Sequence, residues 1–209
     1  MRADGGAVAG VVLAAGSSTR MGQNKLLLRV DGEALVARAA RRATAAGLDP
    51  VIVVLGHEAE RVGRELEGVV CFPIVNPDHA TGQASSFRAG IAAVPESAPA
   101  AVVILADMPH VTAEMIGALV ARYRQAPAPL VISEYGGVHA PPTLYDRSLF
   151  SEIRGMSGDG CGRQVVRRHR GQAQAVAWPA ERLADLDEPA DLERLRAADA
   201  GKDSCAPIS

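Results

Sequence analysis

The chain has 209 residues, with 22 basic and 24 acidic side chains and a formal net charge of −2 at pH 7. Apolar residues make up 48% of it and aromatic residues only 3%. This balance excludes an intrinsically disordered chain, which combines low hydrophobicity with high net charge. It also excludes a dedicated nucleic-acid-binding protein, which is basic overall or in one long segment. Only two of the 22 basic residues, Lys25 and Lys202, are lysine, so Lys25 stands out in a folded region that otherwise uses arginine.

Neither end of the chain predicts a targeting or membrane segment. No stretch approaches the ~20 apolar residues that a membrane-spanning helix needs, and residues 1–7 lack the pattern of a signal peptide. Cys71, Cys161 and Cys205 are widely spaced and form no C-x-x-C pair, which favours reduced thiols over a disulfide framework or a zinc site. We therefore expect a cytoplasmic protein with no membrane partner and with flexible tails at residues 1–7 and 198–209.

Short apolar runs alternate with longer segments of helical period in the first two thirds of the chain. Such alternation is typical of a parallel sheet covered by helices on both faces. It predicts an α/β fold of three layers, with ligand sites at the carboxyl ends of the strands. The predicted strands are 8–14, 51–55, 69–75, 101–106 and 130–132, and the predicted helices are 33–46, 57–66, 84–94 and 112–124.

The C-terminal third follows a different pattern. Residues 138–145 contain two prolines, which favour an extended or antiparallel strand at the edge of the sheet. We expect one domain over residues 8–197 that carries this antiparallel elaboration. The remaining predicted elements are a short helix over 147–153, a glycine-rich loop over 155–162, a basic helix over 163–170, a strand over 173–178 and a closing helix over 189–200.

The loop after the first predicted strand has the composition of a phosphate-binding loop. Residues 13–27 read LAAGSSTRMGQNKLL. Gly16 and Gly22 allow backbone N–H groups to approach anionic oxygens, and Arg20 and Lys25 supply positive charge. The spacing excludes a Walker A loop and a dinucleotide-binding fingerprint, because the glycines and the lysine that those motifs require are not at the required positions.

Two aspartates stand where a carboxylate can hold a hard cation. Asp107 follows a predicted buried strand, and Pro109 ends regular structure just after it. Capping the next helix is an alternative role for Asp107, but Thr112 is better placed for it. Asp187 lies in the stretch DLDEPADL, where Pro189 suits the first position of a helix and leaves Asp187 free. An acidic helix N-terminus, favoured by the helix dipole, is the alternative for this stretch.

Residues 13–27 resemble the signature L-A-x-G-x-S-x-R-x-G-x-x-K of the MobA-like nucleotidyltransferases, and every fixed residue is met. The doublet Ala14-Ala15 is similar to the pyrimidine-nucleotide branch, since the guanine-using branch typically has Gly-Gly before or at Gly16. The resemblance implies a Rossmann-like nucleotidyltransferase fold. The nucleotide-binding residues that it implies in this loop are Leu13, Ala14, Ala15, Gly16, Gly22 and Lys25, and the catalytic residues are Arg20, Lys25 and Asp107.

Two further segments resemble metal-binding elements of the same family. Residues 106–109 are similar to G-D-M-P, with alanine in the glycine position, and residues 185–191 are similar to D-x-D-T-P-x-D, with glutamate in the threonine position. The resemblance implies that Asp107 and Asp187 bind Mg²⁺, with Mn²⁺ as the other candidate.

Three segments resemble elements of molybdenum cofactor cytidylyltransferases. Residues 76–86 are similar to N-P-x-x-x-x-G-x-x-x-S, which implies that Gly82 and Ser86 shape the nucleoside pocket. Residues 139–141 and 158–163 are similar to G-x-P and G-D-x-G-x-R, with Ala140 and Cys161 in glycine positions. The acceptor-binding residues that these two segments imply are His139, Pro141, Asp159 and Arg163.

The sequence leaves two alternatives open for His79 and for the arginines of the basic helix. His79 is either a ligand or a base, or a solvated loop residue. The arginines of the basic helix either receive an anionic acceptor or form a solvated face; they are Arg163, Arg167, Arg168 and Arg170.

The resemblance as a whole implies a CTP:molybdenum cofactor cytidylyltransferase, which transfers CMP from CTP to the molybdopterin phosphate and releases pyrophosphate. The expected partners are CTP, molybdenum cofactor and a recipient molybdoenzyme or its maturation chaperone, with no nucleic acid and with the chain as a monomer. One alternative is a nucleotidyltransferase of the same fold with another phosphorylated acceptor. The other is a non-enzymatic carrier or insertion chaperone for the cofactor.

Overall fold

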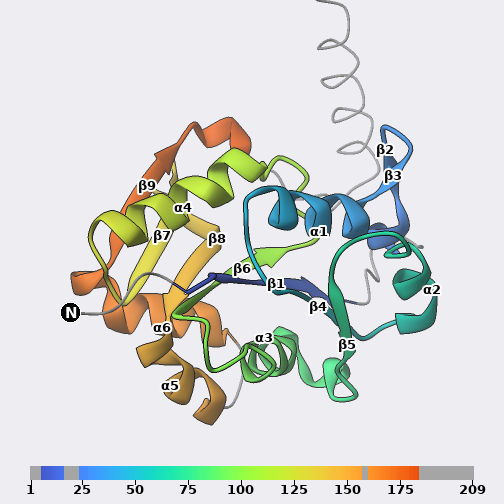
Figure 1. Ribbon diagram of the computed structural model, residues 1–209, viewed down its shortest axis with the longest axis horizontal. Coiled ribbons are helices and arrows are strands. Elements are labelled where there is room, and N and C mark those ends of the chain that lie inside the picture. Colours follow the sequence, from blue (N-terminus) through green and yellow to red (C-terminus); the bar gives the residue numbers. More distant parts are fainter. Residues whose placement is uncertain (1–5, 17–23, 157–159, 184–209) are drawn as a thin grey trace, which may run out of the picture.

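The computed structural model describes residues 6–16, 24–156 and 160–183, and its centre is a seven-stranded sheet in the order β5-β4-β1-β6-β8-β7-β9 (Figure 1). A small antiparallel ribbon of β2 and β3 lies beside the first helix. The strands are β1 (Ala9–Ala14), β2 (Arg29–Val30), β3 (Glu33–Ala34), β4 (Val51–Leu55), β5 (Phe72–Val75), β6 (Ala100–Leu105), β7 (Leu130–Tyr135), β8 (Val138–Asp146) and β9 (Gln174–Trp178).

Helices cover both faces of the sheet, as the alternation of elements in the sequence predicts. The α-helices in the described residues are α1 (Leu35–Ala45), α2 (Ala59–Arg64), α3 (Gln83–Ala92), α4 (Ala113–Gln125), α5 (Phe150–Gly155) and α6 (Cys161–His169). The short 3-10 helices are η2 (Lys25–Leu27), η3 (His79–Thr81), η4 (Arg147–Leu149), η5 (Arg170–Gln172) and η6 (Ala180–Arg182). Among these helices, none is long and apolar enough to cross a membrane.

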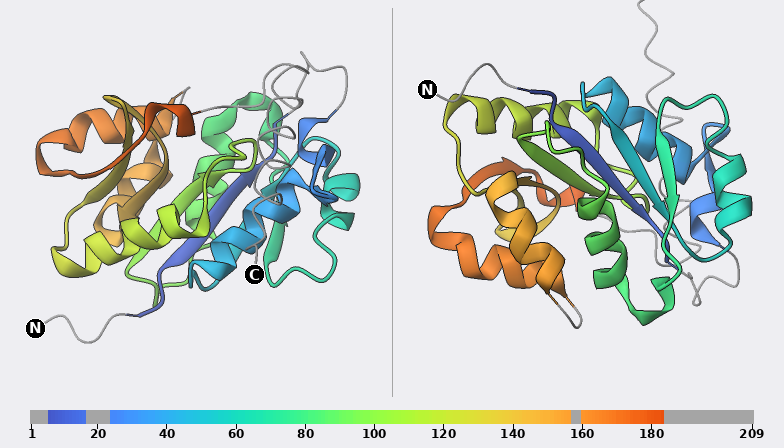
Figure 2. Two further views of the ribbon diagram at one scale, coloured as in Figure 1. Left: turned by 90° about the horizontal axis from the view of Figure 1, so that it is seen from above. Right: turned by 60° about the horizontal axis from the view of Figure 1, so that its bottom comes forward.

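The sheet separates two apolar cores and gives the three-layer fold that the sequence predicts. Helices α1 and α4 lie on one face, and α3, α5 and α6 lie on the other (Figures 1 and 2). Alternate strand residues point to opposite faces, so Val12 and Val53 join the core under α1 and α4, while Val11 and Val54 join the core over α3. All four are fully buried, which is why these strands read as continuous apolar runs.

The prediction that residues 138–145 form an edge strand is wrong, although their antiparallel pairing is confirmed. Strand β8 lies inside the sheet and pairs with both β6 and β7. Pro141 and Pro142 are tolerated because the register with β7 shifts between Ile132 and Ser133, and pairing with β6 stops at Thr143. The prolines therefore occupy a gap in the ladder, where no backbone N–H is required.

The strand predicted at 69–75 is shorter, because its first residues lie in a turn and β5 begins at Phe72. Strand β5 is at the edge of the sheet, and the side chains of Val70, Phe72 and Val75 are exposed. The apolar run there reflects an edge strand with apolar residues on its open side. The closing helix predicted at 189–200 and the tail at 198–209 lie outside the described residues, as do residues 1–5 of the other tail.

Candidate functional site

One edge of the sheet gathers loops from several strands, among them β1, β4, β6 and β8. Strand β1 lies between β4 and β6, and all three run parallel, so the loops that follow them leave the same edge. The connection after β1 leads to β4 on one side of β1, and the connection after β5 leads to β6 on its other side. Such a change of direction leaves a crevice outside the ends of the strands. Because β8 runs in the opposite direction, its first residues return to this edge. The topology therefore brings residues 139–141 close to the loops after β1 and β6.

A first cavity of about 510 Å³ lies over β1. Every described residue that the sequence predicts to bind a nucleotide contributes to its wall, so the structure brings them together. The residues that line this first cavity are Leu13, Ala14, Ala15, Gly16, Lys25, Leu26, His57, His79, Ala80, Gly82, Gln83, Ser86, Leu105 and Asp107.

Gly56 allows the loops after β1, β4 and β5 to meet at the wall of the first cavity. A Cβ atom at Gly56 would lie 2.5 Å from the Cβ of His79 and 2.7 Å from the Cβ of Ala15. Contacts that short do not occur between real side chains, so a larger residue would push the loops apart. The backbone N–H of His57 donates to the carbonyl oxygen of Ala15 at 3.3 Å and closes the same junction.

A buried hydrogen-bond network fixes the start of α3. The Nδ2 atom of Asn76 donates to the hydroxyl oxygens of Ser85 and Ser86, at 2.9 and 3.0 Å, and the Asn76 side chain is buried. Gly82 precedes α3 with φ = 116°, a conformation that favours glycine. Ser86 therefore lines the cavity with its hydroxyl held by Asn76.

Lys25 and Asp107 form an ion pair in the wall of this cavity. Nζ of Lys25 lies 2.5 Å from Oδ2 of Asp107, with 16% and 24% of the side chains exposed. Asn24 begins η2 by accepting from the backbone N–H of Leu26, at 3.1 Å, and so directs Lys25. Thr112 caps α4, as the sequence predicts, and this leaves the Asp107 carboxylate free of a capping role.

A second cavity, of about 630 Å³, begins where the first one ends. The two share Leu13, Gln83, Leu105 and Asp107. Three of the predicted acceptor-binding residues line the second cavity, namely His139, Pro141 and Arg163. Among the described residues that line both cavities, Asp107 is the ionisable one, so its carboxylate lies at the boundary between them.

His139 is held in place by a carboxylate from the neighbouring strand. Its Nε2 atom lies 3.2 Å from Oε2 of Glu134 on β7. This pairing fixes the orientation of the imidazole at the wall of the second cavity. Pro141 presents its ring to the same cavity, while its carbonyl oxygen accepts from the hydroxyl of Tyr135 at 2.9 Å.

The family model of the MobA-like NTP transferase domain matches residues 10–175, which include both cavities. The chain belongs to the MobA-like NTP transferase family. It is 32% identical over 204 residues to the "Purine catabolism protein PucB" of Bacillus subtilis, covering 90% of this chain and 96% of the relative. It is 31% identical over 204 residues to the "Probable molybdenum cofactor guanylyltransferase" of Opitutus terrae, covering 94% of this chain and 98% of that one.

A solved structure extends the likeness to a protein crystallised with a metal. Rv0371c of Mycobacterium tuberculosis in complex with manganese superposes with a TM-score of 0.76 and 26% identity. The alignment covers 92% of this chain and all of that one. The Rossmann-like nucleotidyltransferase fold expected from the sequence is therefore confirmed for this MobA-like chain.

The described residues of this family member offer one carboxylate to a metal. No group of three or more His, Cys, Asp or Glu residues that could hold a metal occurs within 6–16, 24–156 and 160–183. Asp107 is the acidic residue among those that line the two cavities. A single carboxylate suits Mg²⁺ or Mn²⁺ that takes its other ligands from substrate phosphates and water, so the site fits such an ion.

Several predicted site residues of this MobA-like chain lie outside the described residues. They remain sequence-based predictions with no structural account here. They are Arg20, Gly22, Asp159 and Asp187.

The structure adds site residues whose roles the sequence reasoning missed. Gly56 directly follows a buried strand, and a glycine at such a position indicates close packing of loops. Asn76 is the first fixed residue of the motif over residues 76–86, in which the resemblance implies roles for Gly82 and Ser86 only. Arg42 of α1 had no local signal, because its Nη1 atom donates to the carbonyl oxygens of Pro109 and Val111, more than 60 positions away, at 2.5 and 2.7 Å. It tethers the turn that carries Asp107.

Proposed function

We propose that this MobA-like NTP transferase is a CTP:molybdenum cofactor cytidylyltransferase. It transfers CMP from CTP to the terminal phosphate of molybdopterin and releases pyrophosphate. The observation that carries the proposal is that two cavities share one wall at Asp107, with Lys25 paired to it. Transfer between two substrates requires both to meet at one reacting phosphorus, and a binding protein for one molecule needs no such boundary.

The first cavity is proposed to hold CTP. The backbone of Ala14, Ala15 and Gly16 follows β1 directly, where N–H groups can approach phosphate oxygens. Gly82 and Ser86 lie at the start of α3 and would shape the nucleoside end of the cavity. The Ala14-Ala15 doublet supports a pyrimidine nucleotide by resemblance alone, because the guanine-using branch typically has Gly-Gly before or at Gly16.

The second cavity is proposed to hold the acceptor. An oxygen of the acceptor phosphate attacks the α-phosphorus of CTP, and a new P–O bond forms. The bond from the α-phosphorus to the oxygen that bridges to the β-phosphate breaks, and pyrophosphate leaves with that oxygen. No covalent intermediate with the protein is required. Lys25, and by prediction Arg20, offset negative charge that grows on the departing pyrophosphate, and such preorganised charge is a large part of enzymatic catalysis.

A divalent cation, Mg²⁺ or Mn²⁺, would be held by Asp107 and, by prediction, Asp187, and would neutralise phosphate charge. The part that this chain plays is to place the Asp107 carboxylate at the boundary of the two cavities. Arg42 supports that placement from α1, through the carbonyls of Pro109 and Val111. The relative named as a probable molybdenum cofactor guanylyltransferase supports the choice of acceptor. We expect this chain to differ from that relative in the nucleotide that it uses.

The proposal is tested by incubating the full chain with each NTP, Mg²⁺ and purified molybdenum cofactor while pyrophosphate is followed. We expect turnover with CTP and much slower turnover with GTP. Preference for GTP would contradict the interpretation of Ala14-Ala15. A parallel assay replaces molybdenum cofactor with other phosphorylated acceptors, and turnover only with one of these would reassign the acceptor. Tight binding of molybdenum cofactor without turnover of any NTP would instead identify a carrier.

A further inference from the structure

Helix α6 has two flanks of different character. Arg163 and Arg167 of α6 and Arg170, where η5 continues the helix, follow one another at intervals of four and three residues, which places them along one face; we call these three the arginine row of α6. All three line the second cavity, whereas Arg168 does not. The structure thus divides a basic segment that the sequence presents as a single cluster.

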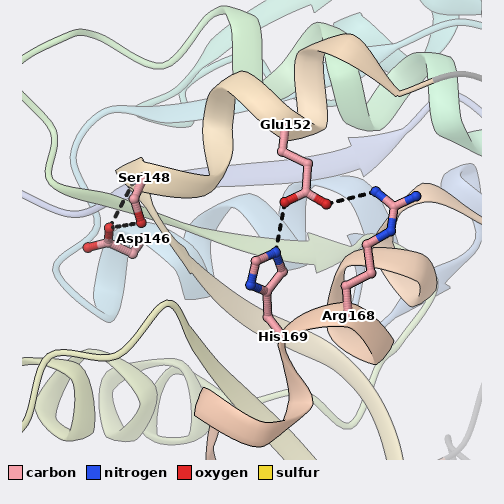
Figure 3. Close-up of polar contacts among 5 residues, drawn as sticks. All are labelled: Asp146, Ser148, Glu152, Arg168 and His169. Atoms are coloured by element: carbon pink, nitrogen blue, oxygen red, sulfur yellow. Dashed lines mark hydrogen bonds and ion pairs between the residues drawn. The ribbon is translucent and has the colours of Figure 1, made fainter.

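The opposite flank of α6 is fixed by an ion-pair cluster with α5 (Figure 3). Oε1 of Glu152 accepts from Nη1 of Arg168 at 2.9 Å, and Oε2 of Glu152 lies 2.7 Å from Nε2 of His169. Cys161 and Val165 are buried and hold the inner side of the helix. With two sides fixed in this way, α6 has one rotation about its axis, and that rotation turns the arginine row toward the cavity.

An apolar wall lines the same cavity as the arginine row. Phe87, Ile132 and Tyr145 contribute to that wall, and the rings of Phe87 and Tyr145 lie 5.2 Å apart. The row itself extends about 10 Å, from the rise of 1.5 Å per residue over seven residues. A cavity with an apolar wall and a cationic rim fits a ligand with a flat apolar body and anionic substituents.

The charge around the second cavity is unbalanced. Its described lining contains three arginines and one acidic residue, Asp107, which is already paired with Lys25. No ion pair joins Arg163, Arg167 or Arg170 to another residue in the described part of the chain. The three arginines are exposed and line the space that a ligand would fill. Planar guanidinium groups recognise phosphate and carboxylate through paired hydrogen bonds.

We infer that the arginine row of α6 is the acceptor-selecting surface of this protein. It binds anionic groups of an acceptor with a flat apolar body and supplies affinity for that acceptor, while the reaction itself takes place at Asp107. This inference rests on the proposed function for the identity of the reaction, but it makes a separate claim about Arg167 and Arg170, which belong to none of the motifs recognised in the sequence.

An equilibrium binding experiment tests this claim without nucleotide or turnover. The probes are pterin-6-carboxylate, which is anionic, and 6-methylpterin, which is neutral; binding of both is followed by pterin fluorescence. We expect the wild-type chain to bind the anionic probe more tightly and in a salt-dependent manner. Arg167→Gln and Arg170→Gln should each weaken binding of the anionic probe by about three- to tenfold and leave the neutral probe unaffected.

Arg168→Gln is the matched control, because it removes the same charge from the neighbouring position on the opposite flank, while the contact of His169 with Glu152 and the buried side chains of Cys161 and Val165 still fix the rotation of α6. It should bind both probes as the wild type does. Equal weakening by Arg168→Gln would overturn the inference, since a general loss of positive charge would then explain the result. Equal binding of both probes by the wild type would overturn it as well.

Kinetics with CTP and molybdenum cofactor separate this inference from the proposed function. If CMP transfer occurs, Arg167→Gln and Arg170→Gln should raise the KM for the acceptor and leave kcat and the KM for CTP within about twofold. Transfer with an unchanged acceptor KM would refute the inference and leave the proposed function standing. No transfer, together with arginine-dependent binding of the anionic probe, would do the reverse.

Discussion

The Lys25 ammonium lies 2.5 Å from the Asp107 carboxylate, although the two residues come from the loops after different strands of the sheet. Both side chains are mostly buried, and the pairing of opposite charges offsets part of the cost of removing them from water. Lys25 lines the first cavity and Asp107 lines both. The pair therefore places a cation and an anion of the protein where phosphates of two substrates are proposed to meet.

Replacement of Asp107 should abolish nucleotidyl transfer without unfolding the protein. Asp107→Asn keeps the size of the side chain but removes the charge that is proposed to hold a divalent cation, so we expect turnover to fall by at least about 100-fold. The residue lies beyond the end of β6, so the fold should be kept, but the mostly buried Lys25 ammonium loses its partner and the thermal midpoint should fall modestly. Pyrophosphate release and thermal unfolding measure the two effects.

Asp78→Asn is the control for this variant, since Asp78 follows β5 near the same edge of the sheet but lines neither cavity. It should turn over at nearly the wild-type rate. A near-normal rate for Asp107→Asn would show that this carboxylate holds no catalytic metal.

Arg42 should act on catalysis through the turn that carries Asp107. Arg42→Met removes the donor to the carbonyls of Pro109 and Val111, which we expect to lower kcat by about tenfold with the KM for CTP almost unchanged. The unfolding free energy should fall by about 1–3 kcal/mol, because two partly buried carbonyls lose their partner. Steady-state kinetics and urea denaturation provide the measurements.

Two further variants distinguish positioning from a general loss of stability. Arg42→Lys keeps a donor and should recover part of kcat. Arg41→Met changes the adjacent arginine, which pairs with Glu33 on the surface, and should leave kcat intact. If Arg42→Met lost stability while its kcat stayed normal, the tether would be structural only.

Asn76 should contribute both to the stability of the fold and to nucleotide binding in the first cavity. Asn76→Ala removes the amide that donates to the hydroxyls of Ser85 and Ser86. Because these hydrogen bonds are buried, their loss should lower the unfolding free energy by about 1–3 kcal/mol. Release of Ser86 should also raise the KM for the nucleotide. Ser86→Ala retains the bond from Asn76 to Ser85, so its stability loss should be smaller. Equal stability of the wild type and Asn76→Ala would contradict this account of the network.

The Glu152 cluster should make a small, pH-dependent contribution to stability. Hydrogen bonds from Arg168 and His169 lower the pKa of Glu152 below its usual value of 4.5 (Figure 3). A carboxyl group with a lowered pKa in the folded state stabilises the fold above its unfolded-state pKa and loses that effect as the pH falls through its folded-state pKa. Because the side chain is 28% exposed, we expect only about 0.2–1 kcal/mol.

Comparison with Glu152→Gln measures this contribution. At pH 7 the variant should unfold at a slightly lower urea concentration than the wild type, and the difference should shrink as the pH falls below 4.5. Glu114→Gln, a change in the first turn of α4, controls for the loss of one acidic charge elsewhere. A difference that grows toward low pH would have the wrong sign for a lowered pKa.

The main features of the fold could be predicted from the sequence because strong local patterns encode them. Runs such as Val51–Leu55 are buried on both faces of the sheet, so they are continuously apolar and easily recognised. The position of β8 could not be predicted in this way. Two prolines point to an edge strand, and only the register shift between Ile132 and Ser133 lets the strand lie inside the sheet.

In the candidate site, likewise, motifs within one segment could be predicted from the sequence and contacts between distant segments could not. Leu13, Gly16 and Lys25 belong to one continuous segment, and its spacing alone predicts a phosphate-binding loop. The tether of Arg42 to Pro109 joins residues 67 positions apart, and nothing in the local sequence of either residue indicates it. In the same way, only the contact of Glu152 with Arg168 separates Arg168 from the arginines that line the second cavity. Contacts between distant segments carry no periodic signal, so they require the structure.

Lys25 gives a further test, because the chain uses arginine at nearly every other basic position. An ammonium group is a compact charge on a flexible stem, and it can follow a phosphate whose geometry changes during transfer. A guanidinium group is larger and planar, and it keeps its charge when buried. The Lys25 side chain is only 16% exposed and lies 2.5 Å from Asp107, so a larger, planar group would change the geometry of this contact. We expect Lys25→Arg to lose most of its turnover, about tenfold or more, while CTP still binds.

Pyrophosphate release and CTP titration calorimetry measure the two properties, with Arg29→Lys as the reverse exchange at an exposed position nearby. Full activity of Lys25→Arg would show that positive charge alone suffices at this position.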